Sequence, residues 1–121
     1  LIGMPAEMSF KTLVARGDKK GISVVCVPCN REVDLKKLAK ATGDKKVELI
    51  HVKELLNLTG YIRGGVSPIG MKKPYPTFIH GTCSNFPFIF ISAGVRGLQL
   101  KINPADLLKV TGASGADLIS D

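Results

Sequence analysis

A glycine-rich stretch in the middle of the chain limits what this sequence can fold into. It covers residues 59–73 and has glycine at positions 60, 64, 65 and 70. Glycine reaches backbone angles that cost other residues energy, and it weakens helix and strand interiors. Pro68 fixes its own φ and biases Ser67 towards extended angles. The stretch is therefore predicted to be a loop whose backbone a ligand can approach closely.

Basic side chains lie within this loop. Arg63, Lys72 and Lys73 would favour an anionic ligand. An ordinary surface connection between a helix and a strand can have the same composition, because a glycine-rich loop alone is a weak signal. A binding role for the loop therefore depends on which residues the fold places next to it.

The size and charge of the chain narrow the classes of function. Its 121 residues, 45% of them hydrophobic, fit one domain. A formal net charge of +7 favours nucleic acid or phosphate-bearing partners, although scattered lysines also occur on ordinary solvated surfaces. The absence of Trp argues against a single-strand binder that stacks bases. Three cysteines suggest no disulfide scaffold and no apolar run could span a bilayer, so we expect a cytoplasmic protein.

The order of the predicted elements indicates an α+β fold. Hairpin-like pairs of strands outnumber helices, which favours a mixed α/β structure with a mostly antiparallel or mixed, barrel-like β-sheet and flanking helices. In the last hairpin, alternation predicts that Leu98, Leu100 and Ile102 point inward and Gln99 outward. Strands are expected at 9–16, 22–27, 46–50, 77–80, 87–92, 98–102 and 116–120, and helices at 34–42, 52–59 and 104–111.

Familiar catalytic motifs are missing from the sequence. It contains no Walker loop, dinucleotide fingerprint or nucleophile elbow, and no carboxylate pair is suited to acid–base work. An enzyme with this sequence would therefore act by positioning and electrostatics, or with help from its substrate.

The cysteines allow a metal or redox hypothesis. Cys26 and Cys29 form a C-x-x-C pair, and His80 and Cys83 could complete a zinc site. Cys26 lies in an apolar strand, where cysteine usually acts as a small core residue. We therefore expect no metal and no cofactor, and keep a metal- or redox-active domain as an alternative.

Two further positions draw attention. Lys11 shares a strand face with Leu13, so it either lies at a sheet edge or points into a pocket as a fixed cation. The small-residue turn at Ser92 and Gly94 follows an apolar strand, where it could either contact a ligand or simply end the strand. Tyr61 is expected to be a packing or rim residue.

Together these pieces resemble the YbaK/prolyl-tRNA synthetase-associated editing domains, and most closely the free-standing YbaK-type Cys-tRNA(Pro) deacylase. The matching segments are FKTLV (10–14), REVDLKKLA (31–39), TGYIRGGVSPIG (59–70), ISAGVRGL (91–98) and NPADLL (103–108). The resemblance implies trans-editing, the hydrolysis of an amino acid wrongly esterified to tRNA, with prolyl-tRNA synthetase as a candidate partner. It also implies that the substrate thiol attacks its own ester carbonyl and gives a cyclic thiolactone.

The resemblance assigns roles residue by residue. Lys11 matches the family's functional lysine, which orients the ester and is the expected catalytic residue. Arg63, Lys72 and Lys73 are candidate tRNA contacts. The expected substrate-binding residues are Gly64, Gly65, Val66, Ser67, Pro68, Ser92 and Gly94.

Two departures from the family pattern stand out. Gln99 occupies a position where relatives often have an acidic pocket residue. The family's N-terminal segment, which contributes an aromatic pocket residue and a helix, is expected to be missing from residues 1–121, which would form a single editing domain. Alternatives are a non-catalytic module that binds aminoacyl-tRNA or a synthetase, and a deacylase for another amino acid such as alanine.

Overall fold

Two β-sheets and three α-helices form the part of the chain that the structure, a computed structural model, describes: residues 6–62, 65–71, 73, 75–95 and 97–120. The strands are β1 (Phe10–Gly17), β2 (Gly21–Pro28), β3 (Val47–Leu49), β4 (Thr77–His80), β5 (Ile89–Ser92), β6 (Gln99–Ile102) and β7 (Ser114–Ala116). The α-helices are α1 (Leu35–Thr42), α2 (Val52–Thr59) and α3 (Pro104–Thr111), and short 3-10 helices cover Ala6–Met8 and Gly81–Asn85.

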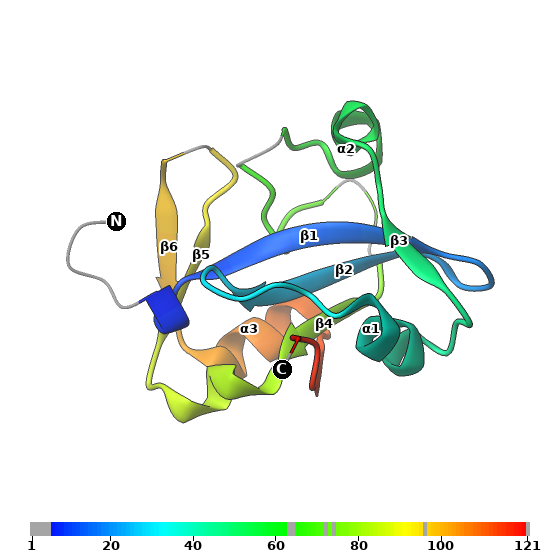
Figure 1. The fold of residues 1–121 in the computed structure, drawn as a ribbon. Helices are drawn as coiled ribbons and strands as arrows, with labels where there is room; N and C mark the ends of the chain where they lie inside the picture. Colours follow the sequence, from blue (N-terminus) through cyan, green and yellow to red (C-terminus); the bar gives the residue numbers. More distant parts are fainter. Residues whose placement is uncertain (1–5, 63–64, 72, 74, 96, 121) are drawn as a thin grey trace.

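The larger sheet is mixed and has the strand order β3-β1-β2-β4-β7 (Figure 1). β1 pairs antiparallel with both β2 and β3, whereas the β2–β4 and β4–β7 pairs are parallel. The β1–β2 hairpin extends over the full length of both strands and places Lys11 opposite Val27. This confirms the α+β class and the mixed sheet predicted from the sequence.

The smaller sheet shows that the barrel expectation is wrong. β5 and β6 form an antiparallel two-stranded ribbon. Its one ladder contact with the larger sheet's side of the chain, in the described residues, is an isolated bridge between Phe90 and Ser9, the residue before β1. Because β5 leaves β1 after this bridge, the two sheets do not close into a barrel.

Capping residues set the helix ends where the sequence predicted them. The Asp34 side chain accepts hydrogen bonds from the backbone N–H groups of Lys36 and Lys37, at 2.9 and 3.0 Å. Asn103 caps α3 in the same way, with Pro104 as its first residue. α1, α2 and α3 each end at a glycine with left-handed backbone angles. None of the helices in the described residues is long and apolar enough to cross a membrane.

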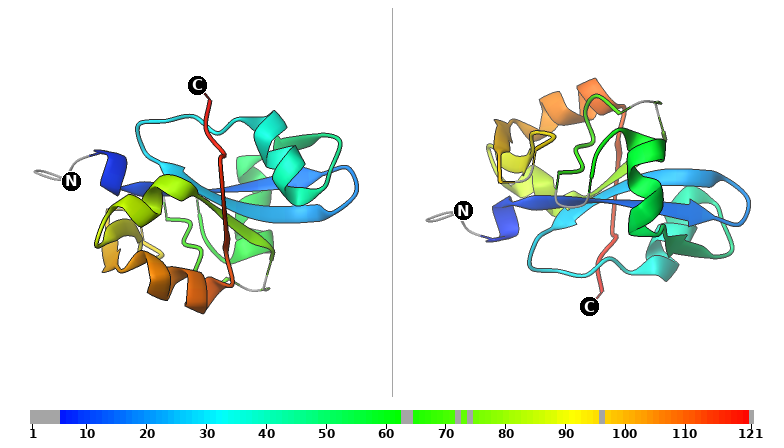
Figure 2. Two further views of the ribbon diagram at one scale, coloured as in Figure 1. Left: turned by 90° about the horizontal axis from the view of Figure 1, so that it is seen from below. Right: turned by 90° about the horizontal axis from the view of Figure 1, so that it is seen from above.

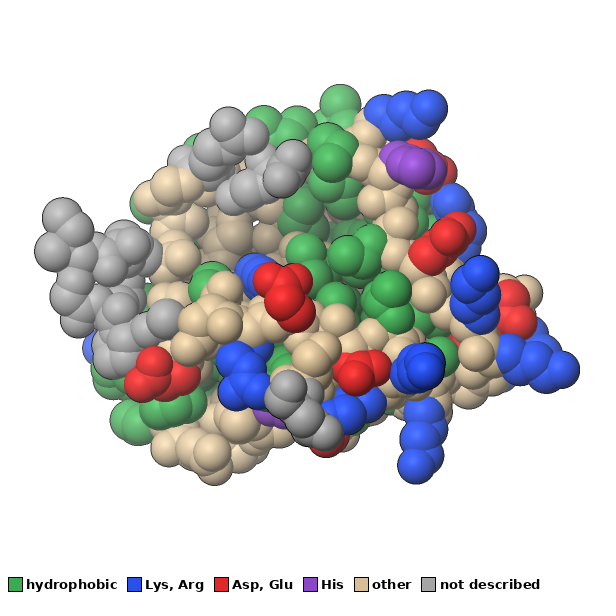
Figure 3. Space-filling view, viewed as in Figure 1, with side chains coloured by type: hydrophobic (Ala, Val, Ile, Leu, Met, Phe, Trp, Pro, Cys, Tyr) green, Lys and Arg blue, Asp and Glu red, His purple; other side chains and the backbone are tan. Residues whose placement is uncertain are grey.

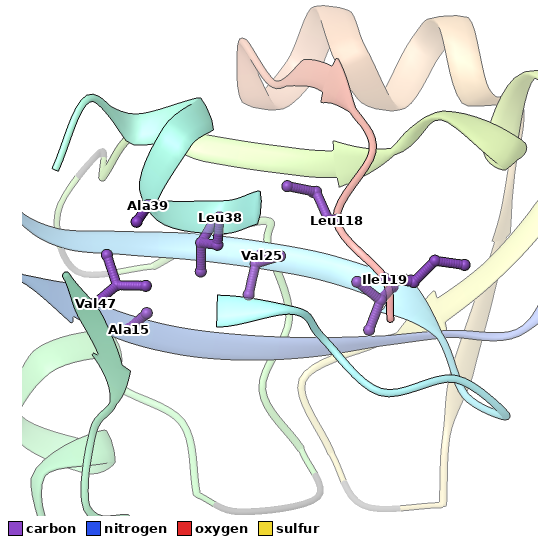
Figure 4. Close-up of a cluster of buried hydrophobic side chains, with 8 residues drawn as sticks. Ala15, Val25, Leu38, Ala39, Val47, Leu118 and Ile119 are labelled. Atoms are coloured by element: carbon purple, nitrogen blue, oxygen red, sulfur yellow. The ribbon is translucent and has the colours of Figure 1, made fainter. Parts of the chain in front are cut away.

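Hydrophobic clusters cover both faces of the larger sheet. Figure 2 shows α1 and α3 on opposite sides of the β1–β2 hairpin. On the α1 side, Leu38 and Ala39 pack with Val25 and Leu118 (Figure 4). A second cluster contains core residues of α3 and β5. A third cluster joins β1, α2 and the glycine-rich loop through Val14, Leu55 and Val66. The loop is thus packed against β1.

Two local expectations fail near the C-terminal half. The last strand is β7 rather than 116–120, and Ile119 makes only an isolated bridge with Val33. Leu98 and Leu100 are 57% and 41% exposed, so the inward orientation predicted for them is wrong, whereas Ile102 packs against a core cluster as predicted. β6 pairs only with β5 in the described residues, so no second strand extends the ribbon beyond it.

Candidate active site

A cavity of about 310 Å³ lies beside β1 and collects several of the predicted site residues. Its walls come from β1, the segment after β2, the glycine-rich loop and the β5–β6 ribbon. The lining residues are Phe10, Lys11, Thr12, Leu13, Cys29, Val66, Ser92 and Gln99. We call it the Lys11 cavity. The face viewed in Figure 3 is hollowed between the β5–β6 ribbon and α2.

A stretch of β1 without a strand partner on one edge, among the described residues, forms the floor of this cavity. On the edge away from β2, the described residues pair β3 with β1 at 15–17, and β5 forms a bridge with Ser9, just before β1. The Val14 carbonyl accepts a hydrogen bond from Ile50 N–H at this edge, at 3.0 Å. Because backbone groups alternate in direction along a strand, the N–H and C=O of Thr12 point to the same edge. The cavity floor therefore offers a backbone donor and an acceptor.

Lys11 is the cation of the cavity. Its side chain is 28% exposed, and its Nζ lies 3.7 Å from Glu32 Oε1. The Glu32 side chain is 87% exposed, so this ion pair is solvent-screened and weak. A substrate oxygen can therefore compete for the ammonium group.

The glycine-rich loop supplies one wall. Residues 65–68 are all buried, and Val66 lines the Lys11 cavity. The Ser67 hydroxyl accepts a hydrogen bond from Ile69 N–H at 3.2 Å, which fixes the turn beyond it. Gly65 N–H donates to the Ile62 carbonyl at 2.9 Å. Val66 is thus the described loop residue that faces the candidate site directly.

Other predicted residues lie elsewhere. Pro68 and Lys73 line a separate cavity of about 240 Å³ beside β4 and α3. Arg63, Gly64 and Lys72 fall outside the described residues. Of the predicted loop contacts that the structure describes, Val66 alone lines the Lys11 cavity.

Ser92 and Gln99 form a cross-strand pair on the opposite wall. The β5–β6 register places them directly opposite each other, and both line the cavity. The Gln99 Oε1 atom is buried and has no hydrogen-bond partner among the described residues. The Ser92 hydroxyl accepts a hydrogen bond from Gly94 N–H at 3.2 Å, so Ser92 also shapes the turn. The family resemblance predicts a pocket position for Gln99, and the cavity lining agrees, whereas the outward orientation predicted from alternation is wrong.

Tyr61 connects the two walls. Its hydroxyl donates to the Ile69 carbonyl at 2.5 Å within the loop. Its ring lies against Gly94, which has a φ of +94°. A Cβ atom on residue 94 would lie 2.9 Å from Tyr61 Cε1. Gly94 therefore acts here through close packing, and Tyr61 has the packing role expected of it.

The cysteines and His80 do not gather into one site. Cys26 is buried in the core, and burial raises the pKa of its thiol to about 12. Cys83 belongs to the same core cluster, whereas Cys29 lines the Lys11 cavity. His80 Nδ1 accepts a hydrogen bond from Leu118 N–H at 3.2 Å. Within the described residues, no group of three His, Cys, Asp or Glu side chains could hold a metal ion, so the zinc hypothesis gains no support.

Cys29 lines the Lys11 cavity, a position that neither the metal nor the redox hypothesis predicted for it. Its pKa is raised, chiefly by burial, while the nearby charge of Lys11 acts in the opposite direction. Only the structure shows that the end of β2 brings this thiol to Lys11.

The lining combines an ammonium group, an amide, two hydroxyls and a thiol, together with backbone polar groups. Among the described residues that line it, none is a histidine or carboxylate that could serve as a general base. Such a site is suited to holding and orienting a polar substrate. Fold and cavity together thus define a small α+β domain with a polar candidate site beside the edge of β1.

Comparison with known proteins identifies the family. Residues 1–110 match the model of the aminoacyl-tRNA editing domain, and the chain belongs to this family. It is 48% identical over 117 residues to an Enterococcus faecalis protein named "Putative Cys-tRNA(Pro)/Cys-tRNA(Cys) deacylase EbsC", covering 97% of this chain and 71% of that protein. It is 36% identical over 72 residues to a proline–tRNA ligase of Streptomyces griseus, covering 60% of this chain and 12% of the ligase.

A solved structure supports the same assignment. It is described as "a putative trans-editing enzyme for prolyl tRNA synthetase" and superposes with a TM-score of 0.92 at 28% identity. The alignment covers 99% of this chain and 75% of that one. The family resemblance inferred from the sequence is confirmed.

Proposed function

We propose that this protein removes cysteine from mischarged tRNA(Pro) by hydrolysing the aminoacyl ester in the Lys11 cavity. The observation that carries this proposal is the meeting of Lys11, Val66, Ser92 and Gln99 around one cavity in a chain of the aminoacyl-tRNA editing family. The 48% identity to a protein named as a Cys-tRNA deacylase supports cysteine as the amino acid.

The chemical need for such an enzyme follows from pocket energetics. An apolar synthetase pocket gains only about 1–3 kcal/mol of discrimination from a methylene-sized difference. Cysteine and proline are similar enough in volume for the synthetase to attach cysteine to tRNA(Pro) by mistake. A second site that hydrolyses the wrong ester restores accuracy.

The proposed reaction uses the substrate's own thiol. Its sulfur attacks the ester carbonyl carbon, a C–S bond forms, and the C–O bond to the ribose breaks. The thiol proton passes to the departing ribose oxygen. Water then opens the cyclic thiolactone to give free cysteine. Holding this thiol in line with the carbonyl can lower the barrier by about 7–11 kcal/mol.

The protein groups would orient and polarise the substrate. The Lys11 ammonium would donate a hydrogen bond to the ester and stabilise the negative charge that develops on its carbonyl oxygen. The buried Gln99 Oε1 has no donor among the described residues and could accept a hydrogen bond from the substrate's α-ammonium group. The described residues that line the cavity include no histidine or carboxylate base, which fits a reaction in which the substrate supplies the nucleophile.

The tRNA body would be held mainly by charge. The net charge of +7 favours salt-sensitive contact with phosphates, with Arg63, Lys72 and Lys73 as candidates. Prolyl-tRNA synthetase is the candidate protein partner, and the cytoplasm, where tRNA is charged, is the proposed location.

A deacylation panel tests this function. tRNA(Pro) charged with cysteine, alanine, proline or serine is incubated with the protein, and the remaining ester is measured over time. We expect rapid loss of the cysteinyl ester only. Serine differs from cysteine by oxygen in place of sulfur, so equal rates for the two would contradict the thiol mechanism. Preferential loss of alanine would indicate the alanine alternative, and binding without hydrolysis would indicate the non-catalytic module.

A further inference from the structure

A second cavity adjoins the Lys11 cavity and plays no part in the function proposed above. It has a volume of about 320 Å³ and lies between β1, β3 and α2. Its lining residues are Thr12, Leu13, Val14, Leu49, Ile50, Val52, Leu55 and Val66. Thr12, Leu13 and Val66 line both cavities. We call it the apolar cavity. A ligand in one cavity therefore lies next to the residues that also line the other cavity.

We propose that the apolar cavity binds the adenine ring of the 3′-terminal adenosine of the tRNA while the aminoacyl group lies in the Lys11 cavity. This inference rests on the proposed function, because the scissile ester joins the amino acid to the ribose of that adenosine. A substrate with its ribose at the shared wall would place its two ends in the two cavities.

The lining fits a neutral planar ring. Apart from Thr12 its side chains are aliphatic, and none of them carries a charge. It is therefore unsuited to a phosphate, which would need cations or N–H clusters. The volume lies at the lower end of the range for small-ligand pockets. A cysteinyl side chain is too small to need this second space, whereas a purine can bury both faces against Leu and Val side chains.

The rim of the apolar cavity is exposed. Leu49 and Val52 are 42% and 54% exposed at its edge. Figure 3 shows hydrophobic side chains gathered on this face next to α2. Exposed apolar groups around a hollow are typical of binding surfaces. Covering them with a base would remove this apolar area from water and favour binding.

The open edge of β1 supplies polar recognition. The Thr12 N–H and C=O point to the edge where the two cavities meet, as argued above from the Val14–Ile50 hydrogen bond. Adenine carries ring-nitrogen acceptors beside an exocyclic amino donor. The Thr12 N–H can donate to a ring nitrogen, and the Thr12 carbonyl can accept from the amino group. One backbone residue thus complements one edge of the base.

Binding of adenosine 5′-monophosphate to the methyl-labelled full chain, followed by NMR, tests this inference without requiring activity. We expect the nucleotide to shift the methyl signals of Ile50, Leu55 and Val66. Val52→Glu places a charge on the rim at the first position of α2, where a carboxylate is compatible with the helix. It should weaken binding by about five-fold or more.

Leu56→Glu is the matched control. Leu56 lies on the same helix, is 52% exposed and does not line the cavity. Leu56→Glu adds the same charge outside the cavity, so it should leave the affinity for the nucleotide nearly unchanged. Unshifted methyl signals in the wild-type protein, or equal weakening by both variants, would overturn the adenine site. If the wild-type protein deacylates Cys-tRNA(Pro) but fails this test, only the subsite is wrong. If it passes but does not deacylate, the subsite stands and the proposed function is wrong.

Discussion

The ring of Tyr61 packs directly against Gly94 and so joins the glycine-rich loop to the turn after β5. The left-handed φ of +94° and the close ring both require glycine at this position. The loop wall and the Ser92 wall of the Lys11 cavity are therefore held at a fixed separation by a contact outside the cavity itself.

Gly94→Ala should destabilise the protein more than Gly97→Ala. Both glycines have left-handed angles, of +94° and +84°, so an alanine should cost about 1–3 kcal/mol of backbone strain at either position. Only at residue 94 would the new Cβ meet Tyr61, because nothing lies within 4 Å of the equivalent Cβ at residue 97. Urea unfolding of both variants measures the difference. Equal losses of stability would contradict the packing role of Tyr61.

Gln99→Met should stabilise the fold and weaken binding of the substrate. The buried Gln99 Oε1 has no partner among the described residues, and such a group costs about 1–3 kcal/mol. Methionine fills similar space without a polar atom, so the free energy of unfolding should rise by about 1 kcal/mol. The same change removes the acceptor proposed for the substrate, so KM should increase. An unchanged KM would show that Gln99 does not contact the substrate.

Cys29 reports the charge of Lys11 directly. Burial raises the pKa of the Cys29 thiol, and the Lys11 charge partly offsets this rise. Lys11→Met removes the charge at similar size, so the pKa of Cys29 should rise further and the rate of its alkylation near neutral pH should fall. Iodoacetamide labelling resolved by peptide mass spectrometry measures this rate. The control Lys73→Met, in a separate cavity, should have no effect.

Faster or unchanged labelling of Cys29 in Lys11→Met would contradict the placement of the lysine. Cys26 should resist labelling in every variant, because it is 1% exposed and its pKa is about 12.

The stability of the fold should fall as the solution is acidified from neutral pH. Burial lowers the pKa of His80; Asp117 opposes this shift, whereas Arg31 and Lys37 add to it. As pH falls below 6.5, the unfolded chain therefore takes up a proton at this position before the folded chain does. Protonation would also remove the Nδ1 acceptor of Leu118 N–H.

Urea unfolding at about pH 7.5 and about pH 5.5 tests this account. The free energy of unfolding should be lower at the acidic pH, and His80→Gln should reduce the difference. A difference of the same size in His80→Gln would show that other groups dominate the acid sensitivity.

Local sequence signals predicted most of the fold. Asp34, Asn103 and the glycines after each helix set helix ends that a short segment encodes by itself. The barrel expectation failed because closure depends on whether β5 follows β1 beyond Ser9, a long-range pairing that no local pattern records. Alternation in the last hairpin failed at Leu98 and Leu100 but held at Ile102, because alternation indicates which side chains share a face and not how much of that face is covered.

The site was predicted only in part, for a related reason. The resemblance drew attention to Lys11, Ser92 and the loop, and the structure brings Lys11, Ser92 and Val66 to one cavity. Cys29 and the unpaired backbone of Thr12 were not predicted as parts of it. Their positions depend on how β2 ends and where β3 and β5 leave β1, which are properties of the assembled sheet.

The most direct test of Lys11 as the catalytic residue is the rate at which Lys11→Ala deacylates Cys-tRNA(Pro), compared with the wild-type protein and with Lys40→Ala, a control on the exposed surface of α1. Wild type and Lys40→Ala should hydrolyse the ester rapidly, and Lys11→Ala should not exceed the rate in buffer alone. A correctly folded Lys11→Ala variant that retains the wild-type rate would contradict the assignment of the Lys11 cavity as the editing site.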